Sequence, residues 1–267
     1  MSRPREFSAY LCDVEGVLVR DKRYEPVPGS VAWFNGLQER GIAAVLVSNN
    51  TTHSPAELVA ELRRVGFAVE PEQVIGALPL AVELLAQRGL RRLLWLGHPR
   101  LAGWWREQGF ALAGARGEAQ PVEAVVLGVN PDLSVDDLER ALPHLREGRA
   151  ELVALHRNAF WLDDRGRRRL GPGAWCAALE TVARAPAIVI GKPQEGLYRA
   201  ALKRVGVAAA QALFISDDPV ADLVTAGRMG MGTALVLSGK HADHAVLGEL
   251  DQEDWPDVIC ERAELIG

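Results

Sequence analysis

The sequence predicts an α/β protein with a doubly wound parallel sheet of the Rossmann-like kind. Short apolar runs that are typical of buried strands alternate with segments of helical periodicity along the chain. These runs are almost continuously apolar, which is typical of strands covered on both faces. Four of the runs end in polar residues, and open α/β sheets bind their ligands at such strand ends.

The first part of the chain contains two predicted strands and two predicted helices. An apolar run over 10–18 carries an acidic pair and a glycine. Helical spacing follows over 30–40 and ends at a glycine. A second run over 43–52 ends in a hydroxyl and two amides. The next helix opens with a serine cap and a proline, and it covers about 54–66.

A second series of strands and helices occupies the middle of the chain, and we expect it to form an inserted α/β cap domain. We therefore predict a discontinuous core domain of residues 1–76 plus 187–267 and a cap domain of residues 77–186. Within the cap the pattern predicts strands over 93–97, 124–128 and 152–155, and a strand and turn over 160–166. It predicts helices over 80–88, 101–108 and 175–183, and a further helix that opens with residues 132–138.

Two further strands are predicted after this insertion. The run 187–190 precedes Lys192 and is expected to return the chain to the first sheet. The run 212–216 precedes Asp217 and Asp218, and Asp222 follows. Parallel strands place their carboxyl ends at the same edge, so the four polar ends are expected to meet at one edge of one sheet.

These four strand ends, in this order, resemble the four motifs of the haloacid dehalogenase superfamily. The chain is similar to subfamily IIA of that family, in which a cap lies between the second and third motifs. It looks like the members that hydrolyse p-nitrophenyl phosphate, phosphoglycolate, pyridoxal phosphate or phospholysine-type substrates. The resemblance implies a Mg²⁺-dependent phosphatase that hydrolyses a small phosphate ester through an aspartyl-phosphate intermediate.

The resemblance assigns the two carboxylates of the first motif to different roles. Asp13 would be the nucleophile and a metal ligand, because a carboxylate attacking phosphorus divides one difficult step into two. Glu15 would be the general acid and base, and its backbone carbonyl would bind the metal. The family usually has aspartate at this second position. The extra methylene of glutamate leaves two alternatives open: a working acid/base, or a weakened phosphatase that acts as a binding or regulatory protein.

The second and third motifs supply predicted phosphate ligands. Ser48 would donate its hydroxyl to a phosphoryl oxygen together with the backbone amide of Asn49, and Asn50 would orient the neighbouring loop. Each of these residues could also be an ordinary helix cap. Lys192 would pair with both the nucleophile and the phosphate.

The fourth motif supplies the remaining predicted metal ligands. Asp217 would bind Mg²⁺ directly, and Asp222 would hold a metal-bound water or brace the other ligands. Asp218 is expected to face solvent or the water shell. Mg²⁺ prefers oxygen ligands and retains several waters, so a few carboxylates and the phosphate are sufficient.

The cap is expected to select the substrate. His156, Arg157 and Asn158 follow a predicted strand and are candidates to face the leaving group of the ester, although a plain surface loop remains the alternative. A cluster of four arginines straddles a turn glycine, and we interpret it as a solvated hairpin (Arg165, Arg167, Arg168 and Arg169).

Composition limits the classes of partner. The formal net charge of -5 argues against a nucleic-acid surface, and there is no apolar run of membrane-spanning length. Three cysteines cannot form a disulfide framework, so we expect a cytoplasmic protein. The resemblance implies a small phosphorylated metabolite as its partner. The resemblance also implies a homodimer formed through the cap. The other alternative within this fold is a dehalogenase, which the lysine and the acidic metal site argue against.

Overall fold

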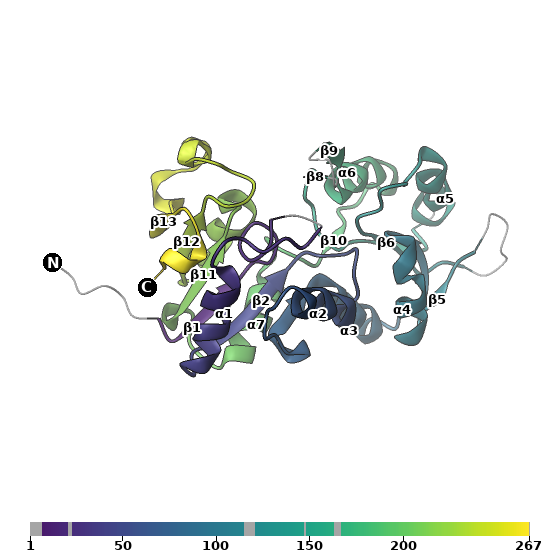
Figure 1. Cartoon of the computed structure of the whole chain (residues 1–267). Helices are drawn as coiled ribbons and strands as arrows, with labels where there is room; N and C mark the ends of the chain where they lie inside the picture. The colour runs from purple at the N-terminus through teal and green to yellow at the C-terminus, as the bar shows by residue number, and fades with distance from the viewer. Residues whose placement is uncertain (1–6, 21–22, 115–120, 147, 163–166, 267) are drawn as a thin grey trace. The chain divides into compact units, whose positions relative to one another are not determined.

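The protein was analysed as a computed structural model, which describes residues 7–20, 23–114, 121–146, 148–162 and 167–266 (Figure 1). The chain divides into two compact units. The first contains Met1–Ser48, Leu58–Ile75 and Lys192–Gly267, and the second contains Asn49–Glu57 and Gly76–Gly191. Each unit is an α/β layer structure, so the predicted fold class is confirmed.

The first unit contains a six-stranded sheet with the order β13-β12-β11-β1-β2-β3. Strand β1 pairs with β2 and β11, and β12 pairs with β11 and β13; all four pairings are parallel. The strands are β1 (Ala9–Cys12), β2 (Ala43–Ser48), β3 (Val74–Gly76), β11 (Ala212–Ser216), β12 (Gly232–Val236) and β13 (Val258–Cys260). The helices are α1 (Ser30–Glu39), α2 (Pro55–Arg64), α7 (Glu195–Val205) and α8 (Val224–Arg228).

Alternate residues of these strands face opposite layers. Cys12 and Ile215 belong to one core cluster with Phe34 of α1 and Leu62 of α2. Phe214, the neighbour of Ile215 in β11, instead packs its ring 5.1 Å from that of Tyr198 in α7. The nearly continuous apolar runs of the sequence therefore correspond to strands that are buried on both faces.

The second unit contains a five-stranded parallel sheet with the order β10-β7-β6-β4-β5 and a two-stranded antiparallel hairpin. The sheet strands are β4 (Arg92–Leu96), β5 (Ala111–Leu112), β6 (Ala124–Leu127), β7 (Glu151–Ala154) and β10 (Ile188–Val189). The hairpin strands are β8 (Phe160–Leu162) and β9 (Arg168–Leu170), and the helices are α3 (Ala77–Gln87), α4 (Ala102–Glu107), α5 (Val135–Arg146) and α6 (Pro172–Ala183).

This second sheet is also covered on both faces. In β6, Val126 packs in a cluster with Leu85 of α3 and Trp105 of α4. Its neighbour Val125 packs in a different cluster with residues of α5 and α6, among them Leu138. The two-residue period of a strand thus separates the two helical layers, as a doubly wound sheet requires.

One prediction about the strands is wrong. The run 187–190 was expected in the first sheet, but Ile188 and Val189 of β10 pair in parallel with Val153 and Ala154 of β7 in the second sheet. Ile190 continues this pairing by donating its N–H to the Ala154 carbonyl, and its side chain is buried in the core of the second unit. The apolar character of a strand does not determine which sheet it joins. For β10 the sheet is determined by its pairing with β7.

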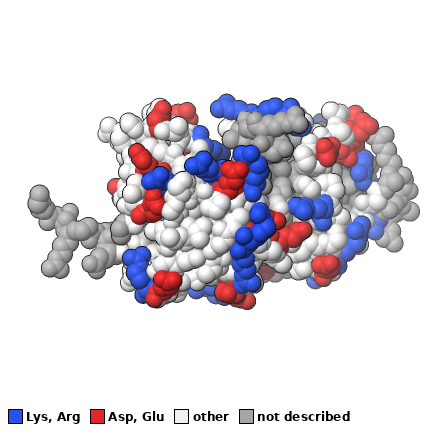
Figure 2. All heavy atoms as spheres, viewed as in Figure 1, with Lys and Arg blue, Asp and Glu red and all other residues white. Residues whose placement is uncertain are grey.

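The predicted division into core and cap remains a proposal. By their contacts, residues 49–57 and 187–191 belong to the second unit. The long segment of that unit therefore covers residues 76–191, whereas the predicted cap covers 77–186. No helix in the described ranges has the length and apolar character needed to cross a bilayer. On the face drawn in Figure 2, the described residues carry charged groups of both signs.

Candidate active site

The carboxyl ends of three neighbouring strands position the site in the first unit. Cys12 at the end of β1 is in register with Ile215 of β11 and Leu46 of β2. Asp13 therefore follows β1 directly, and its N–H donates to the Ile215 carbonyl at 2.9 Å. Ser48 ends β2 and Asp217 follows β11, so the polar ends of these three motifs meet at one edge of the sheet.

Asp13 and Lys192 form a buried ion pair. Lys192 Nζ lies 2.9 Å from Asp13 Oδ1, and the same oxygen accepts the Val14 N–H at 2.8 Å. The Asp13 side chain is 13% exposed and that of Lys192 is 2% exposed. Lys192 lies in the segment before α7, so it enters the site from a loop and not from a strand of the first sheet. These two contacts hold Oδ1 of Asp13 in place.

Asp222 holds the lysine from the other side. Its Oδ2 accepts Lys192 Nζ at 2.7 Å and the Ser216 hydroxyl at 2.6 Å. The Tyr198 hydroxyl donates to the Asp222 carbonyl at 2.9 Å. Burial disfavours the charged ammonium, but Asp13 and Asp222 together outweigh it, so the pKa of Lys192 lies above its ordinary value. The lysine is therefore charged and held in place at neutral pH.

Glu15 lies in the loop after β1, where its Oε2 accepts the Ser48 hydroxyl at 3.4 Å. The following Gly16 has a φ of 86°, a conformation that favours glycine. Its N–H donates to the Val19 carbonyl at 2.7 Å. Because a peptide N–H and the preceding C=O point in opposite directions, this bond also fixes the direction of the Glu15 carbonyl.

Asp217 is 5% exposed and is held by the backbone of a later loop. Its Oδ2 accepts the Lys240 N–H at 2.7 Å. Burial raises the pKa of Asp217 to about 7, although the Lys240 N–H opposes this shift. Asp218 forms an ion pair with Lys240 and accepts the Ala221 N–H at 2.9 Å. Burial opposes ionisation of Asp218, but the Lys240 ammonium outweighs it and lowers the pKa of this carboxyl.

The donor set fits a hard divalent cation. Burial raises the pKa of Asp13 well above its ordinary range; the Lys192 ammonium opposes the rise, and the carboxylates of Asp222, Asp217 and Glu15 add to it. Negative charge therefore exceeds positive charge in a buried place that a cation would neutralise. Within the described ranges, no three acidic, His or Cys side chains converge as a complete site. Mg²⁺ needs only one or two carboxylates besides waters and phosphate.

The predicted phosphate ligands Asn49 and Asn50 belong to the second unit. Asn50 is 6% exposed, and its Oδ1 accepts the N–H groups of Thr52 and His53, both at 3.0 Å. This side chain therefore shapes the loop in which it lies. A Cβ on Gly191 would overlap Asn49 Oδ1, so the glycine allows this asparagine to pack closely.

The predicted specificity residues follow β7 in the second unit. His156 is 3% exposed, and its Nδ1 faces the Asn158 N–H at 3.4 Å. Both nitrogens of the Arg157 fork donate to Glu180 of α6, at 3.0 and 2.9 Å. The Asn158 carbonyl accepts the Gly173 N–H at 3.1 Å. The segment 156–158 is thus a fixed part of the second unit.

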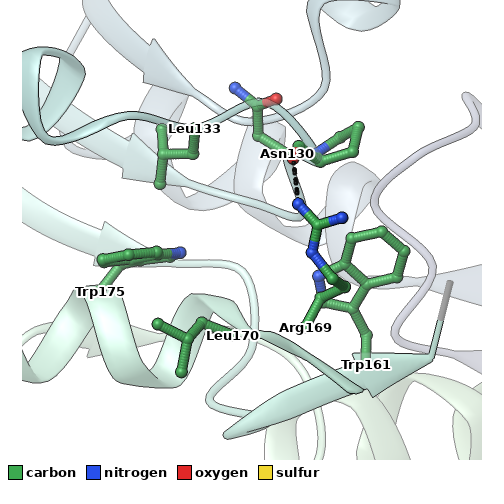
Figure 3. Close-up of a pocket in the computed structure, with 7 residues that line it drawn as sticks. Asn130, Leu133, Trp161, Arg169, Leu170 and Trp175 are labelled. Carbon is green, nitrogen blue, oxygen red and sulfur yellow. Dashed lines mark hydrogen bonds between the residues drawn. The ribbon is translucent and has the colours of Figure 1, made fainter. Parts of the chain in front are cut away.

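A separate pocket opens beside the hairpin of β8 and β9, and none of the three predicted specificity residues lines it (Figure 3). Arg169 donates to the Pro131 carbonyl at 3.0 Å, and Trp161 lies next to it. The lining residues are Asn130, Pro131, Leu133, Trp161, Arg169, Leu170 and Trp175. Of the four predicted surface arginines, Arg167, Arg168 and Arg169 are exposed as expected, whereas Arg165 lies outside the described residues.

Sequence reasoning missed the loop after β12. Ser238 donates its hydroxyl to the Gly16 carbonyl at 2.6 Å, and Lys240 contacts both Asp217 and Asp218. The signal was present, because the mostly apolar run 232–237 is followed by a serine, a glycine and a lysine. This is the same pattern of an apolar run ending in polar residues that identified the other four strand ends.

Comparisons with known proteins give a consistent result. A family model described as haloacid dehalogenase-like hydrolase matches residues 10–111, and a second model of such hydrolases matches residues 189–264. Chronophin from Mus musculus is 33% identical over 236 residues, which cover 86% of this chain and 80% of that protein.

Two solved structures are similar over nearly the whole chain. A p-nitrophenyl phosphatase from Archaeoglobus fulgidus has a TM-score of 0.83 with 24% identity over 98% of both chains, and it shows the fold alone. A glycerol phosphate phosphatase from Mycobacterium tuberculosis, solved in complex with calcium, has a TM-score of 0.79 with 26% identity. The match covers 97% of this chain and 74% of the mycobacterial one.

Proposed function

Because this chain belongs to the haloacid dehalogenase-like hydrolases and is a phosphatase, we propose that it hydrolyses a small phosphorylated metabolite with Asp13 as the nucleophile. The observation that carries this proposal is the buried pair of Asp13 and Lys192 at the end of β1, at 2.9 Å. An ammonium at this position attracts a phosphate dianion and offsets its repulsion of the attacking carboxylate.

The first step transfers the phosphoryl group to the protein. Asp13 Oδ1 is held by Lys192 and the Val14 N–H, so Oδ2 attacks phosphorus in line with the leaving oxygen. The new bond joins Oδ2 to phosphorus, and the bond from phosphorus to the ester oxygen breaks. That oxygen takes a proton from the carboxyl group of Glu15 and leaves as an alcohol. When the substrate is bound, the Ser48 hydroxyl turns from Glu15 Oε2 and donates to a phosphoryl oxygen.

The second step releases phosphate and restores both carboxylates. Glu15, now ionised, removes a proton from water, and the water oxygen attacks phosphorus. The bond between phosphorus and Asp13 Oδ2 breaks, so the aspartate is regenerated and Glu15 is protonated for the next cycle. The contact of Glu15 Oε2 with the Ser48 hydroxyl supports this role, because it holds the carboxyl beside a predicted phosphate donor.

We further propose Mg²⁺ as the cofactor. Asp13, Asp217 and the Glu15 carbonyl would hold it, while Asp222 would act through Lys192 and Ser216. Bound there, Mg²⁺ supplies positive charge that neutralises the phosphate and the surrounding carboxylates. The excess of buried carboxylates around Asp13 supports a cation of this kind. The calcium complex of the mycobacterial relative is consistent with a divalent ion.

The primary test is hydrolysis of p-nitrophenyl phosphate with Mg²⁺ or with EDTA. We expect Mg²⁺-dependent turnover that Asp13→Asn reduces by about a thousandfold or more, as loss of a nucleophile does. The matched control is Asp136→Asn, which changes an exposed aspartate of α5 in the same isosteric way. Activity of Asp13→Asn above a few per cent of wild type would remove Asp13 from the role of nucleophile.

Glu15 decides between a full phosphatase and a weakened one. We expect Glu15→Gln to lower kcat by about a hundredfold or more, because general acid–base help is lost. An activated ester needs little protonation of its leaving group, so the phosphorylated protein should accumulate with it. Glu15→Asp should keep or raise the rate. If wild type and Glu15→Gln are equally slow and only Glu15→Asp is fast, a binding or regulatory role describes the natural protein better.

The substrate is best sought by a screen of phosphorylated metabolites. His156, Arg157 and Asn158 remain our proposal for the residues that select it, with Arg157 acting through its pair with Glu180. The homodimer through the cap, the cytoplasmic location and the lack of a nucleic-acid partner stay predictions. Carbon–halogen hydrolysis is the less favoured alternative, since halide departure does not require the lysine and acidic cluster seen here.

A further inference from the structure

The loop formed by Ser238, Gly239 and Lys240, here called the 238–240 loop, contacts the two segments that carry the proposed metal ligands. Ser238 donates its hydroxyl to the Gly16 carbonyl at 2.6 Å. Lys240 donates its N–H to Asp217 Oδ2 at 2.7 Å. The loop follows β12, which pairs directly with β11, so it lies beside the loop that begins at Asp217. All these residues belong to the first unit.

Two glycines enclose the Asp217 carboxylate. A Cβ on Gly16 would overlap Asp217 Oδ2, and so would a Cβ on Gly239, which would also lie 2.6 Å from the Gly16 Cα. The backbone of the first-motif loop, the carboxylate and the backbone of the 238–240 loop are therefore in direct contact. Only residues without a Cβ permit this packing.

These contacts fix the direction of two of the three proposed metal ligands, the Asp217 carboxylate and the Glu15 carbonyl. The Lys240 N–H occupies Asp217 Oδ2 and so directs Oδ1 away from the 238–240 loop. The Gly16 N–H is held by Val19 and the Gly16 carbonyl by Ser238, so the peptide groups on both sides of Gly16 are fixed. The Glu15 carbonyl belongs to the first of these peptide groups, and its direction is fixed with it.

The ion pair between Lys240 and Asp218 attaches the loop a second time. Asp218 also caps the turn that leads to Asp222 by accepting the Ala221 N–H at 2.9 Å. The backbone of Lys240 thus holds Asp217, while its side chain holds the neighbouring residue. The 238–240 loop is anchored at Gly16, Asp217 and Asp218.

We propose that the 238–240 loop is a positioning element of the metal site, in which Ser238 and Gly239 set the affinity for Mg²⁺ without touching the substrate. This inference rests on the proposed function. Groups that orient metal ligands through hydrogen bonds typically change metal affinity by about tenfold to a hundredfold when they are lost. The loop should therefore control metal binding more than the chemical step.

The test is Mg²⁺ binding measured by isothermal titration calorimetry on the metal-free full chain without substrate. Gly239→Ala adds a single methyl group against Asp217, and we expect the Kd for Mg²⁺ to rise at least about tenfold. The matched control is Gly248→Ala, because a Cβ there meets no atom within 4 Å. This control should change the Kd by no more than about twofold.

A second pair of variants keeps the proposal testable if Gly239→Ala does not fold. Ser238→Ala removes the hydroxyl that holds the Gly16 carbonyl and should weaken Mg²⁺ binding by about tenfold. Ser238→Thr retains the hydroxyl and should restore binding. At saturating Mg²⁺ both alanine variants should recover most of the wild-type kcat, because Ser238 and Gly239 contact Gly16 and Asp217 and supply no reacting group. A purely structural role would not give this separation of Kd from kcat.

The outcomes separate this proposal from the proposed function. Unchanged Mg²⁺ affinity in Gly239→Ala and Ser238→Ala, with a wild type that binds Mg²⁺ and hydrolyses p-nitrophenyl phosphate, overturns the role of the loop alone. A wild type that neither binds Mg²⁺ nor hydrolyses the ester overturns the metal assignment on which both proposals rest. Weaker binding with a lost kcat at saturating Mg²⁺ also overturns the inference, because the loop would then act on the chemical step.

Discussion

Replacing Lys192 by methionine should destabilise the first unit by about 3–4 kcal/mol at pH 7. The ammonium lies 2.9 Å from Asp13 and 2.7 Å from Asp222, and the three side chains are 13% exposed or less. Removing one partner of a buried pair costs about 3–5 kcal/mol, because a buried charge is left without compensation. Methionine retains most of the lysine volume, so lost packing adds little.

Protonation of a carboxyl group limits this loss. A carboxyl with an ordinary pKa near 4 can be protonated at pH 7 at a cost of about 4 kcal/mol, because each pKa unit corresponds to ~1.4 kcal/mol. The variant cannot lose much more than this, since neutralising one of the two carboxylates removes their repulsion. Both arguments give the same range for the free energy of unfolding.

The double variant Lys192→Met/Asp222→Asn tests whether the loss arises from charge. It removes the ammonium together with one of its two carboxylates, so it should be more stable than Lys192→Met by about 1–2 kcal/mol. Hydrogen exchange of the β1 and β11 amides, with EDTA present, measures the free energy of unfolding of the first unit. The β4 and β6 amides of the second unit serve as an internal control. A loss below about 1 kcal/mol in Lys192→Met, or strictly additive effects in the cycle, would refute the reasoning.

Three further predictions concern other parts of the chain. Asp217→Ala should raise the Mg²⁺ concentration for half-maximal activity by about a hundredfold or more, and Asp218→Ala by no more than about tenfold; equal shifts in a magnesium titration would contradict the ligand assignment. Glu123 accepts the N–H groups of Arg91 and Arg92 at 2.5 and 2.8 Å, which lower its pKa, so Glu123→Gln should lose up to ~1 kcal/mol at pH 7. A carboxyl whose pKa is lowered on folding stabilises the folded state above the pKa that it has in the unfolded chain, and this stabilisation is lost as the pH falls through its pKa in the folded protein. Urea unfolding at low pH should therefore show no difference between Glu123→Gln and the wild type. Arg157→Ala should change the ranking of substrates but keep p-nitrophenyl phosphate hydrolysis within about tenfold, and a uniform loss on all esters would place this residue elsewhere.

The sequence predicted the fold class and family correctly, and both are confirmed. The reason is local: β1, β2 and β11 are nearly continuous apolar runs, and polar residues mark where each run ends. The position of a strand end along the chain therefore gave the position of Asp13, Ser48 and Asp217 at one sheet edge.

The sheet membership of 187–190 could not be predicted in the same way. The residues of β10 are as apolar as those of β11, and only the neighbouring β7 places them in the second sheet. The sequence also gave no sign that Asp222 binds Lys192, because an acidic residue five positions after a strand end suits several roles. Pairings of this kind depend on distant segments, and local pattern does not encode them.

The route of Lys192 into the site has a chemical consequence. Its ammonium comes from the start of the chain segment that returns to the first unit after the insertion, and the carboxylates on both sides of it follow β1 and β11. A strand end would fix the backbone of such a lysine through sheet hydrogen bonds, whereas here the side chain is fixed by Asp13 and Asp222. Asp222 therefore does for the lysine what the 238–240 loop does for Asp217. In each case one side of the group is held by another residue of the first unit. In the proposed function this would leave the Lys192 ammonium to face the phosphate and Asp217 Oδ1 to bind Mg²⁺.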